Sequence, residues 1–185
     1  MRGELLDSTL CISLMELLSE RLLLRLWRVE DAESLASLAD NRNVWVNLRV
    51  RFPKPYTAAA AEAWIRRRER EAKRSLQLAI MADECVVGGI GIEFDLNPRA
   101  KAGELGYWLG EEYWNRGLAG EAVQLITEWA FTGLGLNRLS AVVREGNPAS
   151  SRLLEKAGFR LASKVRRGGR RPSAHVVELV YVRDA

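Results

Sequence analysis

Cysteine and histidine, the residues that most often bind metals or crosslink a chain, are scarce in this sequence. Its 185 residues include two cysteines and one histidine. Cys11 and Cys85 lie far apart and form no metal-ligand pattern with His175, so the sequence predicts neither a disulfide framework nor a zinc site. We expect no metal, and the sparse cysteines favour a reducing, cytoplasmic compartment.

Long apolar runs are missing as well. No stretch has the length that crosses a bilayer, and in segment 5–18 the charges of Asp7 and Glu16 interrupt the apolar residues. That segment also lacks the small-residue cleavage site of a signal peptide, so we expect no membrane partner. With 48% hydrophobic and 28% charged residues, the composition is that of an ordinary globular chain, and its length suits one compact domain.

Basic residues gather in two short clusters, and the net charge is +4. In the cluster at 66–74, Glu69 and Glu71 are interleaved with the basic residues, a pattern typical of a solvated helix face. In the cluster at 164–171 no acidic residue intervenes, and its glycines indicate an exposed hairpin. A nucleic-acid or ribosomal partner would need such basic surface, but solvation explains both clusters, so we do not favour a nucleic-acid partner.

The spacing of apolar residues alternates along the chain between the periods of a strand and of a helix. We expect an N-terminal extension over 1–14 and one domain over 15–185. Strands are expected over 22–26, 76–81, 86–94, 103–110, 139–143, 159–165 and 176–182. Helices are expected from about 31 to 38, after Thr57 to about 74, from 117 to about 130 and over 149–156, with 41–56 as a loop. This order, β-α-α-β-β-β-α-β-α-β-β, predicts an α/β fold of the α+β kind, with a mixed sheet that is part antiparallel and part parallel.

One loop has the features of a phosphate site. Residues 113–122, Tyr-Trp-Asn-Arg-Gly-Leu-Ala-Gly-Glu-Ala, follow a strand and open a helix, which presents backbone N–H groups at the positive end of the helix dipole. Gly117 and Gly120 would let a pyrophosphate approach the backbone closely, and Arg116 would add charge. A helix start without a ligand can carry the same glycines, so the residues alone leave both interpretations open. The spacing is not that of a P-loop, and Gly88–Gly91 lies inside a strand, unlike a dinucleotide fingerprint.

A second segment again combines a strand with a capped helix. Residues 144–159 read Arg-Glu-Gly-Asn-Pro-Ala-Ser-Ser-Arg-Leu-Leu-Glu-Lys-Ala-Gly-Phe, and Asn147 is suited to cap the helix. Together and in this order, 116–119 and 147–159 resemble the acetyl-CoA signature of the GNAT superfamily of N-acetyltransferases. Residues 20–25 and 106–109 also resemble its RimJ/RimL-type, ribosomal-protein alanine N-acetyltransferase-like branch. The resemblance covers about residues 15–181.

The resemblance implies a GNAT fold with a splayed central sheet and acetyl-CoA as co-substrate in the gap between the splayed strands. It implies that main-chain groups of Trp108 and Leu109 pair with the pantetheine arm, and that the Leu109 N–H polarises the thioester carbonyl. The diphosphate would lie on the glycine-containing loop, and residues of the second segment would flank the thiol. The implied cofactor-binding residues are Trp108, Leu109, Arg116, Gly117, Leu118, Ala119, Gly120, Asn147, Ser150 and Arg152.

Two positions depart from the family pattern. The first Gln or Arg of the loop motif is Trp114 here, which leaves the backbone amides of the loop intact. The tyrosine that many GNAT enzymes use to protonate the leaving thiolate would fall at Leu154, which has no proton to give. In the RimL-type branch a serine takes that role, and Ser150 occupies its position.

The general base is less constrained than the acid. A carboxylate can accept the amine proton directly or through water. Strand alternation puts Glu104 on the same face as Gly106 and Trp108, which makes it the first candidate, although a solvent-facing glutamate is the alternative. His175 is the second candidate, and Glu121 is expected to serve the helix N-terminus.

The acceptor amine is where the residues say least. The loop that lines the acceptor side in this fold carries Trp45, Arg49, Arg51, Phe52 and Tyr56, and core packing explains its aromatic residues equally well. The RimJ/RimL resemblance implies a protein N-terminal α-amine, with a small amine or an antibiotic as the alternative. A non-catalytic acyl-CoA-binding module is a further alternative, and a homodimer is left open.

Overall fold

The computed structural model describes residues 16–46, 48, 54–167 and 176–185. The expected N-terminal extension therefore lies outside the described residues, as do Cys11, Arg49, Arg51, Phe52 and His175.

Within the described part of the chain, eight strands form one sheet in the order β1-β2-β3-β4-β5-β6-β8-β7. Neighbouring strands are antiparallel except β5 and β6, which are parallel. The expected mixed sheet is thus confirmed. The strands are β1 (Glu16–Leu18), β2 (Leu23–Leu26), β3 (Ser75–Ala82), β4 (Cys85–Phe94), β5 (Ala102–Leu109), β6 (Arg138–Arg144), β7 (Arg160–Arg167) and β8 (Val176–Asp184).

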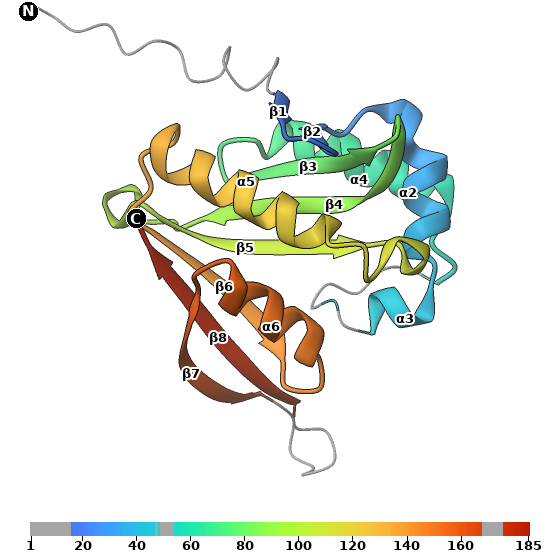
Figure 1. The fold of residues 1–185 in the computed structure, drawn as a ribbon. Helices are drawn as coiled ribbons and strands as arrows, with labels where there is room; N and C mark the ends of the chain where they lie inside the picture. The colour runs from blue at the N-terminus through green and yellow to red at the C-terminus, as the bar shows by residue number, and fades with distance from the viewer. Residues whose placement is uncertain (1–15, 47, 49–53, 168–175) are drawn as a thin grey trace, which may run out of the picture.

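Helices cover both faces of the sheet. α5 (Leu118–Thr132) and α6 (Pro148–Lys156) pack on one face, within the larger cluster of buried apolar residues. α2 (Ala32–Ala39) and α4 (Ala58–Arg70) pack on the other, within a second cluster. Figure 1 shows α5 crossing in front of the sheet with α4 behind it. None of the helices in the described ranges is long and apolar enough to cross a membrane.

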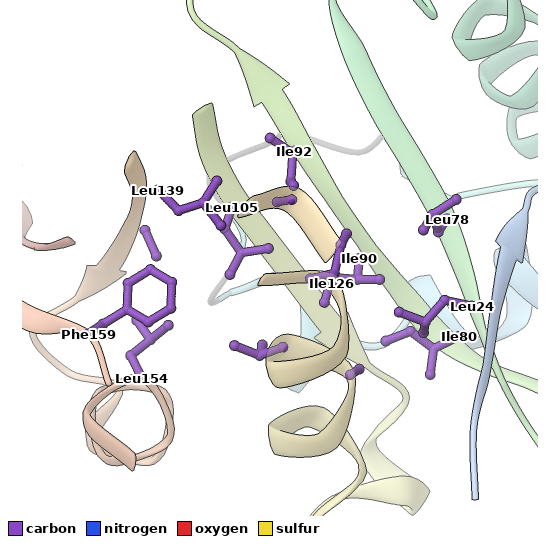
Figure 2. Close-up of a cluster of buried hydrophobic side chains, with 14 of the residues drawn as sticks. Leu24, Leu78, Ile80, Ile90, Ile92, Leu105, Ile126, Leu139, Leu154 and Phe159 are labelled. Atoms are coloured by element: carbon purple, nitrogen blue, oxygen red, sulfur yellow. The ribbon is translucent and has the colours of Figure 1, made fainter. Parts of the chain in front are cut away.

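The helical spacing predicted after residue 117 defines the buried face of α5. Its fully buried apolar residues are Ala122, Val123, Ile126 and Ala130, and Gly133 is the C-terminal cap. Figure 2 shows Ile126 among the sheet residues of the larger cluster, with Leu154 of α6 beside Phe159. Each such Leu, Ile or Val side chain contributes about 1.5–3 kcal/mol when it leaves water, so tertiary packing holds α5 on the sheet.

The expected elements are all present, with a few additions. The segment expected as a loop, 41–56, contains the short helix α3 (Arg42–Trp45), whose N-cap Asn41 accepts a hydrogen bond from the Asn43 N–H at 2.8 Å. β1 and three short 3₁₀ helices, Val29–Asp31, Pro98–Ala100 and Glu111–Tyr113, are further additions. These pieces are too short to show a period in the sequence. α4 also ends at Arg70, earlier than the expected 74.

A buried ion pair fixes the end of β2 against the start of α2. Two guanidinium nitrogens of Arg25 lie 2.7 and 2.8 Å from the two carboxylate oxygens of Asp31, and the Arg28 N–H donates to the same carboxylate at 2.8 Å. Both side chains are less than a tenth exposed. Desolvation alone would raise the pKa of Asp31, but the hydrogen bonds from Arg25 and Arg28 outweigh it and lower this pKa.

Replacing Asp31 by Asn should destabilise the fold by about 3 kcal/mol, because Arg25 would keep its charge in a buried site without a counter-ion. Chemical denaturation at neutral pH measures this loss. Because the pKa of Asp31 is lowered, its carboxylate stabilises the fold above the unfolded-state pKa of about 3.9, and this stabilisation is lost as the pH falls through the folded-state pKa. The free energies of unfolding of the wild type and Asp31→Asn should therefore converge in acid. Asp184→Asn is the control, because its pairs with Arg138 and Arg160 are exposed. Equal losses in the two variants would contradict the prediction.

Candidate functional site

A gap opens in the sheet where its two parallel strands part. β5 and β6 pair from Ala102 opposite Arg138 to Leu105 opposite Ala141, while β5 continues to Leu109 with β4 on its other side. Figure 1 shows the two strands diverging from there. The second half of β5 therefore has a neighbouring strand on one edge only.

The hydrogen-bond alternation of β5 shows which residues face this gap. The Gly110 N–H donates to the Val87 carbonyl at 2.9 Å, and the Asp95 N–H donates to the Ala102 carbonyl at 3.0 Å. Even-numbered residues of β5 therefore direct their main-chain groups toward β4, and odd-numbered residues direct theirs away from it. Of the two residues named from the sequence for this edge, Leu109 faces the gap, whereas Trp108 faces β4.

Tyr107 is thus the second residue whose main chain faces the gap, two positions before Leu109. The Leu109 carbonyl accepts a hydrogen bond from the Trp114 indole N–H at 2.9 Å, which fixes the loop after β5. The Leu109 N–H, directed into the gap, has no strand beside it. An extended, amide-containing ligand finds here the kind of edge to which a further strand would add.

The gap belongs to a cleft of about 1270 Å³ that passes the starts of α5 and α6 and the far face of β5. Nine of the ten residues predicted to bind the cofactor line it, and Arg116 does not: the nine are Trp108, Leu109, Gly117, Leu118, Ala119, Gly120, Asn147, Ser150 and Arg152. The structure thus brings the two sequence segments, 113–122 and 144–159, to one hollow.

The start of α5 has the geometry of an anion site. Gly117 is the N-cap with a φ of 79°, in the left-handed region, and has no side chain to cap the helix. The first hydrogen bond of the helix runs from the Glu121 N–H to the Gly117 carbonyl at 3.2 Å. The three N–H groups before it, of residues 118–120, have no partner within the helix. They are available to an anion at the positive end of a 15-residue helix.

Two arginines lie at this helix start. The guanidinium of Arg116 lies over the ring of Tyr113, 5.5 Å from its centroid, and Arg116 itself is exposed. Arg21, from the turn before β2, lines the cleft and donates to the Arg116 carbonyl at 3.1 Å. It also binds the carboxylate of Glu121 at 2.6 and 2.9 Å. The sequence predicts no role in the site for Arg21, which it offers only within the resemblance over residues 20–25.

Glu121 is held by more than Arg21. The Ser19 hydroxyl donates to its carboxylate at 2.7 Å, and the Arg21 N–H donates at 3.2 Å. Desolvation would raise the pKa of Glu121, but these hydrogen bonds outweigh it, so the pKa is lowered. The carboxylate is therefore ionised and paired. This pairing limits its repulsion of an anion at the helix start.

The start of α6 holds a pair of hydroxyl groups. Asn147 caps this helix as predicted, since its side chain accepts from the Ser150 N–H at 3.2 Å. The Ser150 Oγ lies 2.6 Å from the Tyr107 Oη, so a hydrogen bond joins α6 to β5 across the gap. Burial raises the pKa of Tyr107 to about 12, although the hydrogen bond with Ser150 opposes it.

Sequence reasoning missed Tyr107 as a site residue. The signal was present in the strand period, which puts Tyr107 on the same face as Leu105 and Leu109. Both leucines are buried in the larger cluster, so a hydroxyl group on that face needs a polar partner.

The opposite face of β5 forms the other side of the cleft. Glu104, Gly106 and Trp108 share this face, and β4 presents Glu93 and Gly91 opposite the first two. A Cβ atom on Gly106 would have nothing within 4 Å, so the space above it is open. Further walls come from Gln77, Arg68 and the rings of Trp27 and Trp64, whose centroids lie 5.9 Å apart.

The structure describes two of the residues predicted for the acceptor, Trp45 and Tyr56. Tyr56 is 4% exposed, within the cluster under α2 and α4. Trp45 lies on α3 with the Lys54 ammonium 3.1 Å from its ring centroid. Neither lines the cleft, whereas Val44 and Leu48 from the same segment do. Arg49 and Phe52 lie outside the described residues.

Three further positions can be compared with the sequence analysis. Glu104 is half-buried and lines the cleft. Leu154, at the position of the family tyrosine, is fully buried in the core. Cys85 is exposed and does not line the cleft, and no cluster of metal-ligating side chains occurs among the residues that the structure describes.

Comparison with known proteins gives consistent matches. An acetyltransferase (GNAT) domain model matches residues 21–160. The uncharacterised N-acetyltransferase p20 of Bacillus licheniformis is 33% identical over 149 residues, which cover 77% of this chain and 81% of p20.

Two solved structures have the same fold. A ribosomal-protein-S5-alanine acetyltransferase from Vibrio fischeri matches with a TM-score of 0.79 at 17% identity, over 92% of this chain and 96% of that one. RimL, a ribosomal L7/L12 alpha-N-protein acetyltransferase in complex with coenzyme A, matches with a TM-score of 0.78 at 20% identity, over 92% and 98% of the two chains.

Alanine at two glycines of the α5 start should change stability with opposite signs. Gly117→Ala forces a Cβ into the left-handed region and should cost about 1–2 kcal/mol. Gly120→Ala adds a helix-favouring residue with nothing within 4 Å of its Cβ, and should stabilise by up to about 1 kcal/mol. Chemical denaturation without ligand measures both. Gly146→Ala, also in open space, is the control. Stability changes of the same sign in Gly117→Ala and Gly120→Ala would contradict the described geometry of the α5 start.

Proposed function

The chain belongs to the GNAT family of acetyltransferases, and on that premise we propose that it transfers the acetyl group of acetyl-CoA directly to a primary amine. One observation carries this proposal: a single cleft joins the start of α5, the free edge of β5 and the hydroxyl of Ser150, with Glu104 on its far side. These are the groups that binding and transfer of an acyl thioester require.

Acetyl-CoA suits this cleft along its whole length. The N–H groups of residues 118–120 would hold the diphosphate, with the charges of Arg116 and Arg21 beside them. The pantetheine amides would pair with the outward main-chain groups of Tyr107 and Leu109, and Asn147 and Arg152 would flank the arm. Trp108 would contribute its ring to the acceptor side. RimL, which has the same fold, was solved with coenzyme A.

The reaction assigns one role to each of three groups. The amine nitrogen attacks the thioester carbon, and the Leu109 N–H stabilises the oxygen that becomes negative. Glu104 accepts the amine proton directly or through water, and Ser150 protonates the sulfur as the C–S bond breaks. A C–N bond replaces the C–S bond, and no covalent enzyme intermediate is needed.

We favour a protein N-terminal α-amine as the acceptor. Two proteins with this fold carry names that state action on ribosomal proteins. The open space over Gly106, with tryptophan rings on one side and carboxylates on the other, would admit an ammonium group and an apolar first side chain. A small-molecule amine would meet the same groups and is the second candidate.

Ser150→Ala should lower kcat by about a hundredfold while leaving the affinity for acetyl-CoA nearly unchanged, because only the leaving sulfur needs the hydroxyl. The measurement is release of the CoA thiol in the presence of peptide N-termini and of small amines, with mass spectrometry to find the acetylated product. Wild-type release must depend on the amine. Tight CoA binding without turnover on any acceptor would instead favour an acyl-CoA-binding module, and an unchanged rate in the variant would remove Ser150 from the reaction.

Gly106→Val should raise the KM for the acceptor about tenfold or more, because its side chain fills open space beside the reacting amine. The KM for acetyl-CoA should stay the same, since this face of β5 is opposite Tyr107 and Ser150. Gly146→Val is the matched control, because its Cβ also meets nothing and the residue does not line the cleft. A rise in both KM values would contradict this prediction, because Gly106 would then border the acetyl-CoA site as well as the acceptor site.

A further inference from the structure

The hydroxyl pair of Tyr107 and Ser150 is the shortest side-chain link across the gap described above. Its oxygens are 2.6 Å apart, and either can be the donor. Ser150 is held from the other side by the Asn147 cap on its N–H, and Tyr107 by its position in β5. Two elements therefore fix the relative position of the two oxygens.

A serine hydroxyl alone is a poor source of a proton for a thiolate. A cysteine thiol ionises at a pH of about 8.5 and a tyrosine phenol at about 10, whereas serine is not among the side chains that titrate in water. A serine that gave up its proton without replacement would leave an alkoxide, the least stable anion of the three. A phenol behind the serine removes this obstacle, because the negative charge then resides on the ring oxygen.

We propose that Tyr107 is a positioning residue that acts through Ser150, supplying the proton that Ser150 passes to the leaving sulfur; this rests on the acetyl transfer proposed above. As the C–S bond breaks, its electron pair goes to sulfur, and sulfur takes the proton of the Ser150 Oγ. In the same step the Oγ takes the proton of the Tyr107 Oη. The tyrosinate recovers a proton from solvent, so the enzyme returns to its starting state.

The surroundings of Tyr107 determine when it can give up its proton. Its ring packs against the larger apolar cluster, and burial raises its pKa to about 12. It is therefore protonated at neutral pH, but the raised pKa also makes it a weaker acid than tyrosine in water, so its proton leaves only in the same step in which sulfur takes the proton of Ser150. The same burial makes the tyrosinate short-lived, which favours its prompt reprotonation.

The alternative role for the pair is mechanical, a clamp that holds α6 to β5. A clamp would affect stability and cofactor affinity, whereas a proton supply affects kcat and its dependence on pH. If the two hydroxyls act as one unit, removing either one should abolish the contribution of both to kcat. Removing the second hydroxyl should then lower kcat little further.

The test is a double-mutant cycle with Tyr107→Phe, Ser150→Ala and the double variant. Tyr107→Phe should lower kcat about ten- to a hundredfold, with the KM for acetyl-CoA within twofold of the wild type. The double variant should be no more than about threefold slower than Ser150→Ala. The deficit of Tyr107→Phe should shrink as the pH is raised from about 7 to about 9.5, because a thiolate then leaves without needing a proton.

Tyr181→Phe is the matched control. It also removes a buried phenol, one that donates to Glu155 at 3.2 Å, but it does not line the cleft. Its kcat should equal that of the wild type.

Three outcomes would overturn the inference. A wild-type kcat in Tyr107→Phe excludes the role, as does a double variant whose loss is the product of the two single losses. A pH-independent deficit with a raised KM indicates the clamp. Wild-type turnover is measured first: if it is absent, the acetyl transfer itself is contradicted, whereas an active wild type with an unaffected Tyr107→Phe contradicts Tyr107 alone.

Discussion

The site depends on the short length over which β5 and β6 pair. Their parallel ladder ends at Leu105 and Ala141, yet β5 continues for four residues in which β4 is its neighbouring strand on one edge only. The helix that follows each strand begins near the gap, because a strand-to-helix connection brings the helix start to the carboxyl end of the strand. α5 and α6 therefore both direct their N-termini toward the same hollow. A longer ladder would fill the gap with β6 and leave no edge for a ligand.

β5 also divides the proposed chemistry between its two faces. The odd-numbered face carries Tyr107, which meets Ser150 at 2.6 Å. The even-numbered face carries Glu104 and the open space above Gly106. A proton taken from the amine would thus leave on one side of the strand, while the proton for sulfur would arrive on the other. Separate donors and acceptors avoid the requirement that one group hold both protons in turn.

Local signals in the sequence were enough for most of the fold but not for contacts between distant elements. The helical period after Gly117 and the cap at Asn147 depend on near neighbours, and the structure has both. The hydrogen bond between Tyr107 and Ser150 joins residues 43 positions apart, and the ion pair of Arg21 with Glu121 joins residues 100 positions apart. The gap likewise depends on how distant strands pair, so no local sequence pattern predicts any of these features. An aromatic residue in a loop can serve either core packing or ligand binding, and the sequence does not distinguish the two for Tyr56. The structure places Tyr56 in the buried cluster under α2 and α4.

The glycines of β4 and β5 show which parts of the cleft packing explains. Glycine weakens a strand, so each needs a reason. A Cβ at Gly88 would overlap the Trp108 carbonyl, and one at Gly89 would lie 2.8 Å from the Trp108 indole nitrogen. Gly91 is similarly crowded by Gln77. Gly106 differs, because nothing in the described structure lies within 4 Å of its Cβ position. Packing does not require a glycine there, whereas an acceptor that approaches the strand between Glu104 and Trp108 would.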